Sequence, residues 1–102
     1  MSVKKLNREE FEKARKEEGL ILLDFYADWC GPCRMVAPVL EEVSQLRKDV
    51  LVGKINVDAE EALAREFGIV SIPTLIVLKN GKIQKQVAGV RTREQILELL
   101  EG

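Results

Sequence analysis

The chain has 102 residues, of which 46% are hydrophobic and 32% are charged, and its 16 basic and 17 acidic side chains leave a net charge of -1. This length predicts one small domain over residues 1–102, and a near-neutral balance provides no general attraction to nucleic acid or to an anionic membrane. The absence of histidine excludes Ser/His/Asp and Cys/His catalytic pairs, and two cysteines alone cannot complete a tetrahedral zinc site without a second subunit. We therefore expect no metal, no nucleic acid partner and no membrane partner.

The N-terminal residues and the apolar runs bear on localisation. No stretch approaches the roughly 20 apolar residues of a membrane span, and the longest run, residues 20–23, is interrupted by Asp24. The first ten residues become highly charged where a secretory signal carries its apolar segment. The expected location is the reducing cytoplasm. A chain from which a signal had been removed would show the same pattern.

The first predicted elements are a strand over residues 3–6 and a helix. Asn7, followed three residues later by Glu10, resembles a capping box that begins the helix, and Gly19 is expected to end it. Leu20–Tyr26 is an almost continuous apolar run, which is typical of a strand covered on both faces.

A long amphipathic helix is predicted next. Apolar side chains recur at three- and four-residue steps over residues 31–48, and residues 50–57 then read as a second long strand. Two strands joined by a helix predict parallel pairing with a right-handed crossover.

The last third of the chain predicts a helix, a hairpin and a final helix. Asp58 is expected to cap a helix over residues 59–67, and a strand follows at Thr74–Lys79. Asn80-Gly81 is a strong two-residue turn signal, so residues 82–87 should return antiparallel. Thr92 with Gln95 resembles a second capping box. The predicted fold class is α/β, a mixed sheet between helices.

Both cysteines fall in one short motif, Trp29-Cys30-Gly31-Pro32-Cys33, between the apolar strand and the long helix. A helix N-terminus stabilises a thiolate, so Cys30 is expected to be the nucleophile that attacks a disulfide. Cys33, one turn further on, can resolve the mixed disulfide that results. Gly31 lets a substrate backbone approach, and Pro32 stiffens the first turn. The same two cysteines would also fit a structural disulfide or two inert thiols.

Two ionisable residues are candidates for proton transfer at this motif. Asp24 lies within the apolar strand, where desolvation should raise its pKa and suit it to accept the proton of the resolving thiol. A polar group satisfied by backbone or water is the alternative interpretation. In the predicted strand over residues 50–57, Lys54 points to the same face as Val50 and Val52, because every second residue does. This places Lys54 toward the same interior and near Asp24. A solvated surface lysine is the other interpretation.

The segment from Asp24 to Arg34 closely resembles the active-site segment of the thioredoxin family. The likeness extends in order over nearly the whole chain, and the matching features are Pro38, Lys54, Asn56-Val57-Asp58, Ile72-Pro73-Thr74, Lys79-Asn80-Gly81 and Gly89.

The resemblance implies a thioredoxin fold, a central five-stranded mixed sheet flanked by four helices. It also implies a cis peptide bond at Ile72-Pro73 beside the dithiol, which the residues themselves do not indicate. Trp29, Ile72 and Gly89 would border a groove for the partner peptide, with Gly31, Pro32 and Pro73 in it. Asp24 and Lys54 would serve proton transfer to Cys33.

The activity that the resemblance implies is reduction of protein disulfides by a monomer without a bound cofactor, re-reduced by a thioredoxin reductase that uses NADPH and FAD. An oxidant or isomerase of an export compartment is a second interpretation, although such relatives usually have a histidine between the cysteines. A binding module with incidental redox activity is a third. Tyr26 stands where many members have tryptophan, Arg34 replaces a frequent lysine, and the basic segment 90–93 is unusual beside the expected groove.

Overall fold

A computed structural model describes residues 3–101 and shows one five-stranded sheet. The strand order is β1-β3-β2-β4-β5; β3 pairs in parallel with β1 and β2, and β4 pairs antiparallel with β2 and β5. The predicted mixed sheet is thereby confirmed. The strands are β1 (Val3–Lys5), β2 (Leu20–Tyr26), β3 (Val50–Asn56), β4 (Thr74–Lys79) and β5 (Lys82–Ala88).

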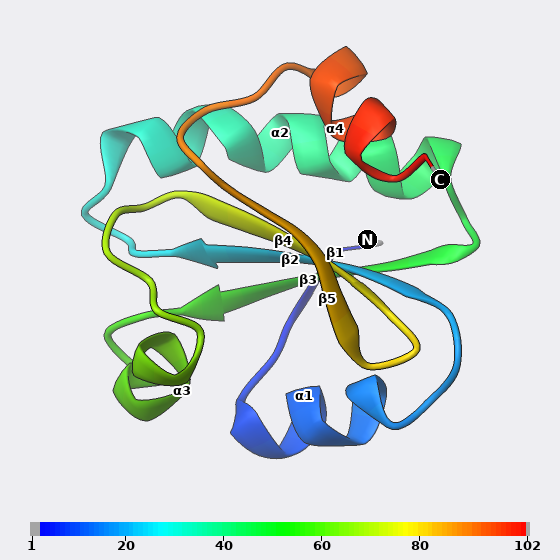
Figure 1. The fold of residues 1–102 in the computed structure, drawn as a ribbon. Coiled ribbons are helices and arrows are strands. Elements are labelled where there is room, and N and C mark those ends of the chain that lie inside the picture. The colour runs from blue at the N-terminus through cyan, green and yellow to red at the C-terminus, as the bar shows by residue number, and fades with distance from the viewer. Residues whose placement is uncertain (1–2, 102) are drawn as a thin grey trace.

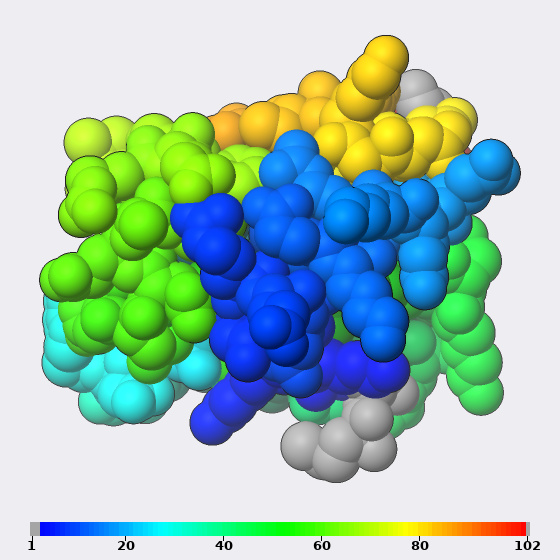
Figure 2. All heavy atoms as spheres, turned by 90° about the horizontal axis from the view of Figure 1, so that it is seen from below, coloured from blue at the N-terminus to red at the C-terminus, as the bar shows by residue number. Residues whose placement is uncertain are grey.

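Four helices cover the two faces of this sheet, as the family resemblance implied. α2 and α4 lie on one face and α1 and α3 on the other (Figure 1). Figure 2 shows the second face, where α1 lies beside α3 and Arg8 of α1 pairs with Glu66 of α3. No helix in residues 3–101 is long and apolar enough to cross a bilayer. The helices are α1 (Arg8–Arg15), α2 (Gly31–Leu46), α3 (Glu61–Glu66) and α4 (Arg93–Leu99).

The central strand β2 supplies side chains to both cores, because successive residues of a strand point to opposite faces. Leu23 and Phe25 pack into the cluster beneath α1 and α3. Leu22 packs beneath α2 and α4. The same alternation places Asp24 on the α2 face, at the end of the strand from which the chain enters α2. The strand thus carries a carboxylate into the interior beneath the first turn of α2.

The first helix is shorter than predicted. The capping box of Asn7 and Glu10 is present, but α1 ends at Arg15 rather than near Gly19. Gly19 has φ +128°, its N–H donates to Asn80 Oδ1 at 2.8 Å, and its carbonyl oxygen accepts from the Asn80 N–H at 3.0 Å. These two bonds attach Gly19 to the turn between β4 and β5. Gly19 therefore positions the start of β2 and does not end α1.

The predicted role of Asp58 as a helix cap is wrong. α3 begins at Glu61, and Glu60 at its N-cap makes no side-chain capping bond. The side chain of Asn56 accepts from the N–H groups of Asp58 and Ala59 at 2.8 and 3.2 Å, so the turn after β3 is closed by Asn56. This arrangement leaves the carboxylate of Asp58 free to bond elsewhere.

The remaining turn predictions are confirmed. Asn80 and Gly81 have φ angles of 51° and 82°, the left-handed pair that a type I′ turn requires. Thr92 and Gln95 form the second capping box at the start of α4.

Candidate redox site

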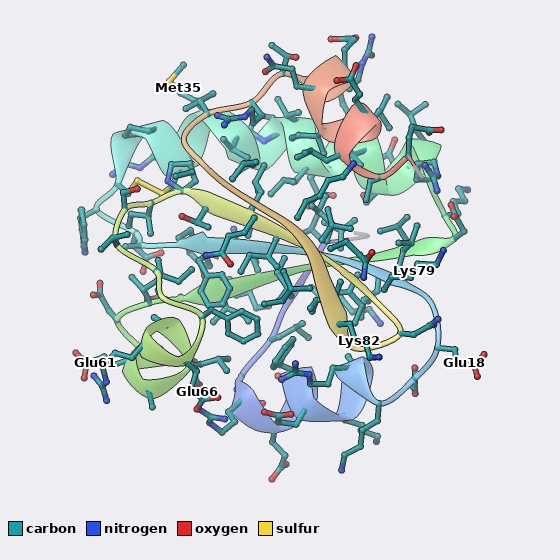
Figure 3. The ribbon with its side chains drawn as sticks, in the orientation of Figure 1. Glu18, Met35, Glu61, Glu66, Lys79 and Lys82 are labelled. Carbon is teal, nitrogen blue, oxygen red and sulfur yellow. A yellow bond between two sulfur atoms is a disulfide. The ribbon has the colours of Figure 1, made fainter. Side chains whose placement is uncertain are left out.

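The two cysteines form a disulfide at the point where β2 leads into α2 (Figure 3). Cys30 is the N-cap residue of α2, and Cys33 lies in its first turn. Their Cα atoms are 5.3 Å apart, and each residue is only 4% exposed. The disulfide is therefore held by the start of a helix and lies just below the molecular surface.

The helix start directs positive electrostatic potential at Cys30. The N–H of Cys33 donates to Sγ of Cys30 at 3.2 Å, and the helix dipole adds a partial positive charge at the same end. Pro32 lies at the first helical positions, where an N–H has no partner within the helix. In the reduced state these features favour a thiolate at Cys30.

Asp24 is buried beside this disulfide with an exposed fraction of 1%. Its Oδ1 has no hydrogen-bond partner among the described residues. Burial raises the pKa of Asp24 to about 7, and the positive charge of Lys54 opposes the rise. The direction agrees with the sequence prediction, and desolvation is the cause that the sequence indicated.

Lys54 lies next to Asp24 in the register of β2 and β3, on the predicted side of the sheet. The two side chains do not form an ion pair within the described residues. Instead, the ammonium of Lys54 lies 4.3 Å from the centre of the Tyr26 ring, a cation–π contact. Lys54 therefore acts on Asp24 by longer-range attraction, and the aromatic side chain at position 26 helps to place it.

A small cavity of about 140 Å³ joins these groups beside the helix. Asp24 and Cys33 both line it, so a water molecule in the cavity could connect the carboxylate with the sulfur. The complete lining is Asp24, Tyr26, Ala27, Asp28, Cys33, Arg34, Ala37 and Lys54.

The loop before β4 forms the other border of the disulfide. The Ile72-Pro73 peptide bond is cis, as the resemblance implied. The carbonyl oxygen of Ile72 lies 3.9 Å from Sγ of Cys30, and the carbonyl oxygen of Pro73 accepts from the N–H of Gly89 at 2.8 Å. The structure thus brings Ile72, Pro73 and Gly89 together beside Cys30, although Pro73 and Gly89 are 16 positions apart in the sequence.

Trp29 lies on the surface at the same end of the sheet, 68% exposed. Its indole Nε1 donates to Oδ2 of Asp58 at 2.8 Å. Asp58 is the site residue that sequence reasoning assigned to another role. The match of the Asn56-Val57-Asp58 segment to the family was the available signal, but helix capping explained the aspartate equally well.

Several apolar side chains are exposed, including three that the sequence analysis did not name as binding residues. Val70 is 99% exposed and Val90 is 42% exposed. Met35 is 65% exposed on the outer surface of α2, where Figure 3 shows it pointing away from the sheet. Val70 and Val90 belong to the two loops that meet through Pro73 and Gly89.

No group of three His, Cys, Asp or Glu residues within residues 3–101 is arranged to hold a metal ion. The disulfide, the buried carboxylate and the two loops are the chemically distinctive groups at this end of the sheet. Once the Cys30–Cys33 disulfide is reduced to the dithiol, these groups can pass two electrons to a second disulfide and move one proton.

Comparison with known proteins gives one consistent result. The family model for Thioredoxin matches residues 2–102. Thioredoxin of Bacillus subtilis is 44% identical over 101 residues, covering 98% of this chain and 96% of the relative. Thioredoxin of Chlamydia caviae is 45% identical over 82 residues, covering 80% of each chain. Among solved structures, a mutant thioredoxin from Halobacterium salinarum is similar with a TM-score of 0.89 and 34% identity, covering 97% of this chain and 87% of that one.

Proposed function

This chain belongs to the thioredoxin family of thiol–disulfide oxidoreductases, and we propose that it reduces protein disulfides, with Cys30 as the attacking and Cys33 as the resolving residue. The observation that carries the assignment is the asymmetry of the pair. Cys30 receives the N–H of Cys33 and the positive end of α2, whereas Cys33 lines the cavity that also contains Asp24. Different electrostatic environments suit the two sulfur atoms to different steps.

The first step is attack by the Cys30 thiolate on one sulfur of the substrate disulfide. A bond forms between Cys30 and that sulfur, the substrate disulfide breaks, and the second substrate sulfur leaves as a thiolate that takes a proton from water. The exposed surfaces of Gly31 and Pro32 leave room for a substrate segment above the helix start. Trp29, Ile72, Pro73 and Gly89 would border that segment.

The second step releases the substrate and uses the proton site. Asp24 in its ionised form accepts the thiol proton of Cys33, directly or through water in the cavity, and Cys33 then attacks Sγ of Cys30. The Cys30–Cys33 disulfide forms, the remaining substrate sulfur leaves as a thiolate, and two electrons have passed from the dithiol to the substrate. Lys54 favours the ionised form of Asp24, since its charge opposes the rise in the pKa of the carboxyl group.

The resulting disulfide must be reduced again for turnover. We assign this role to a thioredoxin reductase that carries FAD and uses NADPH, with no cofactor or metal bound by this chain. The proposal places the protein in the cytoplasm, where a reducing poise keeps such dithiols reduced. In this proposal the protein is a monomer without nucleic acid or membrane partners. Residues 1–102 form one domain, and the family match over residues 2–102 supports these domain bounds.

A matched pair of cysteine variants tests the assignment. In an insulin-reduction assay with dithiothreitol, the parent should accelerate precipitation and both Cys30→Ser and Cys33→Ser should lose that acceleration. Only Cys33→Ser should retain a mixed disulfide with substrate, because its nucleophile is intact. Full activity in both variants would reject the dithiol mechanism, and trapping by Cys30→Ser alone would reverse the two roles.

The recycling step and the direction of electron flow have separate tests. A bacterial NADPH-dependent thioredoxin reductase should oxidise NADPH in the presence of the parent and insulin. A reduction potential in the range of strong oxidants would contradict the proposed reductase role and favour an oxidase of an export compartment.

A further inference from the structure

The loop between β5 and α4 lies beside the disulfide and carries an arginine. Gly89, at its start, donates its N–H to the carbonyl oxygen of Pro73 at 2.8 Å. The carbonyl oxygen of the preceding residue, Ile72, is 3.9 Å from Sγ of Cys30. A short chain of contacts therefore connects the loop with the sulfur that is proposed to meet the substrate, and Arg91 follows Gly89 by two residues.

Both ends of this loop are held in place. Gly89 is bonded to Pro73 at one end and has φ +96°. At the other end, the side chain of Thr92 accepts from the N–H of Gln95 at 3.1 Å, and the side chain of Gln95 accepts from the N–H of Thr92 at 2.9 Å. Only Val90 and Arg91 lie between the fixed residues, so the backbone that carries the arginine has little freedom.

The side chain of Arg91 lies against its own loop. The residue is half-buried, and its Nη1 lies 3.3 Å from the position that a Cβ on Gly89 would occupy. That nitrogen donates to the carbonyl oxygen of Val90 at 3.2 Å. No carboxylate of residues 3–101 forms an ion pair with Arg91, whereas Arg93 pairs with both Glu42 and Glu94.

A half-buried cation without a carboxylate partner is prepared to bind one. The guanidinium has five N–H donors in a planar fork that matches a carboxylate. The bond from Nη1 to the carbonyl oxygen of Val90 holds the guanidinium against the loop, so part of the side-chain entropy is already lost before binding. The exposed Val90 next to it offers apolar surface to the same segment.

The opposite border of the disulfide has the reverse charge. Asp58 accepts the indole N–H of Trp29 at 2.8 Å, and the exposed Asp28 directly precedes Trp29. Arg34 donates to the backbone carbonyl of Asp28 at 3.0 Å and not to its carboxylate. Asp28 and Asp58 together outweigh the charge of Arg34, so a substrate carboxylate gains no attraction beside Trp29, whereas it is attracted to Arg91 beside Gly89.

We propose that Arg91 is a specificity-determining residue that selects substrates with an aspartate or glutamate close to the reactive disulfide, on the side of the bound segment that faces Gly89. This inference rests on the proposed disulfide-reductase function and adds the charge of the preferred substrate. It also states on which side of the bound segment the acidic residue must lie, since an acidic residue on the Trp29 side would not increase the rate of reduction.

Single-cysteine peptides test the inference. Each peptide is joined through a disulfide to one uncharged fluorescent thiol and carries Glu, Gln or Lys either before or after its cysteine. Stopped-flow fluorescence with the reduced protein gives the second-order rate constant. At low salt, and for one of the two positions flanking the cysteine, the rate constant of the Glu peptide should exceed that of the Lys peptide by about threefold to tenfold. The ratio should fall in about 0.5 M salt, because added ions screen exposed charges.

Three variants locate the effect. Arg91→Gln should abolish the difference between Glu and Lys peptides while leaving the Gln peptide unchanged, and Arg91→Glu should invert the preference. Arg93→Gln is the matched control, because that arginine is already paired with Glu42 and Glu94, and it should retain the parent preference. Circular dichroism verifies that each variant is folded.

The outcomes separate the inference from the function on which it rests. Equal rates for all peptides with the parent would contradict the inference and leave the reductase function intact. Absence of reduction of any peptide would contradict the reductase function itself. Persistence of the Glu preference in Arg91→Gln would reject this residue as its source.

Discussion

The two faces of the sheet differ in what they bury. Beneath α1 and α3, Phe67 packs against Phe11 and Phe25, with ring centres 5.6 and 5.5 Å apart. Beneath α2, the buried groups include Asp24, which is the only buried charged side chain of residues 3–101. Both faces contribute apolar packing, but only the α2 face also accepts a desolvated carboxylate beside the disulfide. The chemistry therefore depends on one side of β2, whereas stability depends on both.

The largest loss of stability is expected on the aromatic face. Phe11→Ala should reduce the free energy of unfolding by about 3–5 kcal/mol, because it removes a fully buried ring and leaves a cavity. Denaturant unfolding measures the change, and insulin reduction at a temperature where the variant is folded should match the parent. Loss of activity in the folded variant would show that the two faces are not independent.

Replacing the buried carboxylate of Asp24 is expected to increase the free energy of unfolding. Burial raises the pKa of Asp24 from 3.8 to about 7, so the folded protein holds this proton more tightly than the unfolded chain. The resulting stability is complete below pH 3.8, decreases as the pH rises, and is lost above pH 7. Asp24→Asn, which does not titrate, should therefore exceed the oxidised parent by about 4 kcal/mol above that range.

Two measurements check the consequences of this substitution. Unfolding of the oxidised proteins as a function of pH should show the difference disappearing toward acid. Resolution of the mixed disulfide by Asp24→Asn should be slower than in the parent near pH 7 and above, where the parent carboxyl group ionises. An unchanged resolution rate would reject the proton-transfer role, even if the stability increased as expected.

A smaller effect is expected at Lys54. Lys54→Met removes the positive charge that opposes the rise in the Asp24 pKa, so that pKa should increase further. A higher pKa would reduce the ionised fraction of Asp24 at neutral pH and slow resolution of the mixed disulfide accordingly. Carbon NMR of the Asp24 carboxyl group measures the pKa directly, with Lys48→Met as a surface control. A lower pKa in Lys54→Met would contradict this interpretation.

The smallest effect is expected at the start of α1. Asn7→Ala removes the side chain that accepts from the N–H of Glu10 at 2.8 Å and should lower the free energy of unfolding by about 1 kcal/mol. Asn7→Ser retains a capping oxygen and should recover most of the loss. Neither variant should change the rate of disulfide reduction, and a change in that rate would connect the α1 face with the site.

Much of the architecture could be predicted because its signals are local. The continuous apolar run of Leu20–Tyr26, the helical repeat after Cys30 and the Asn80-Gly81 turn each depend on neighbouring residues. The two errors at Gly19 and Asp58 have a common cause. In each case a partner distant in sequence, Asn80 or Trp29, binds the residue that local rules assigned to a helix end.

The dithiol, the helix start on which it lies and the burial of Asp24 could all be predicted from the sequence, because motif spacing and strand composition are properties of adjacent residues. The side chains that surround the dithiol became apparent only from the folded chain. The contact of Gly89 with Pro73, the position of Lys54 over the Tyr26 ring and the lack of a partner for Arg91 within residues 3–101 all depend on how separate strands and loops meet. Such contacts join residues far apart in the chain, and no local pattern specifies them.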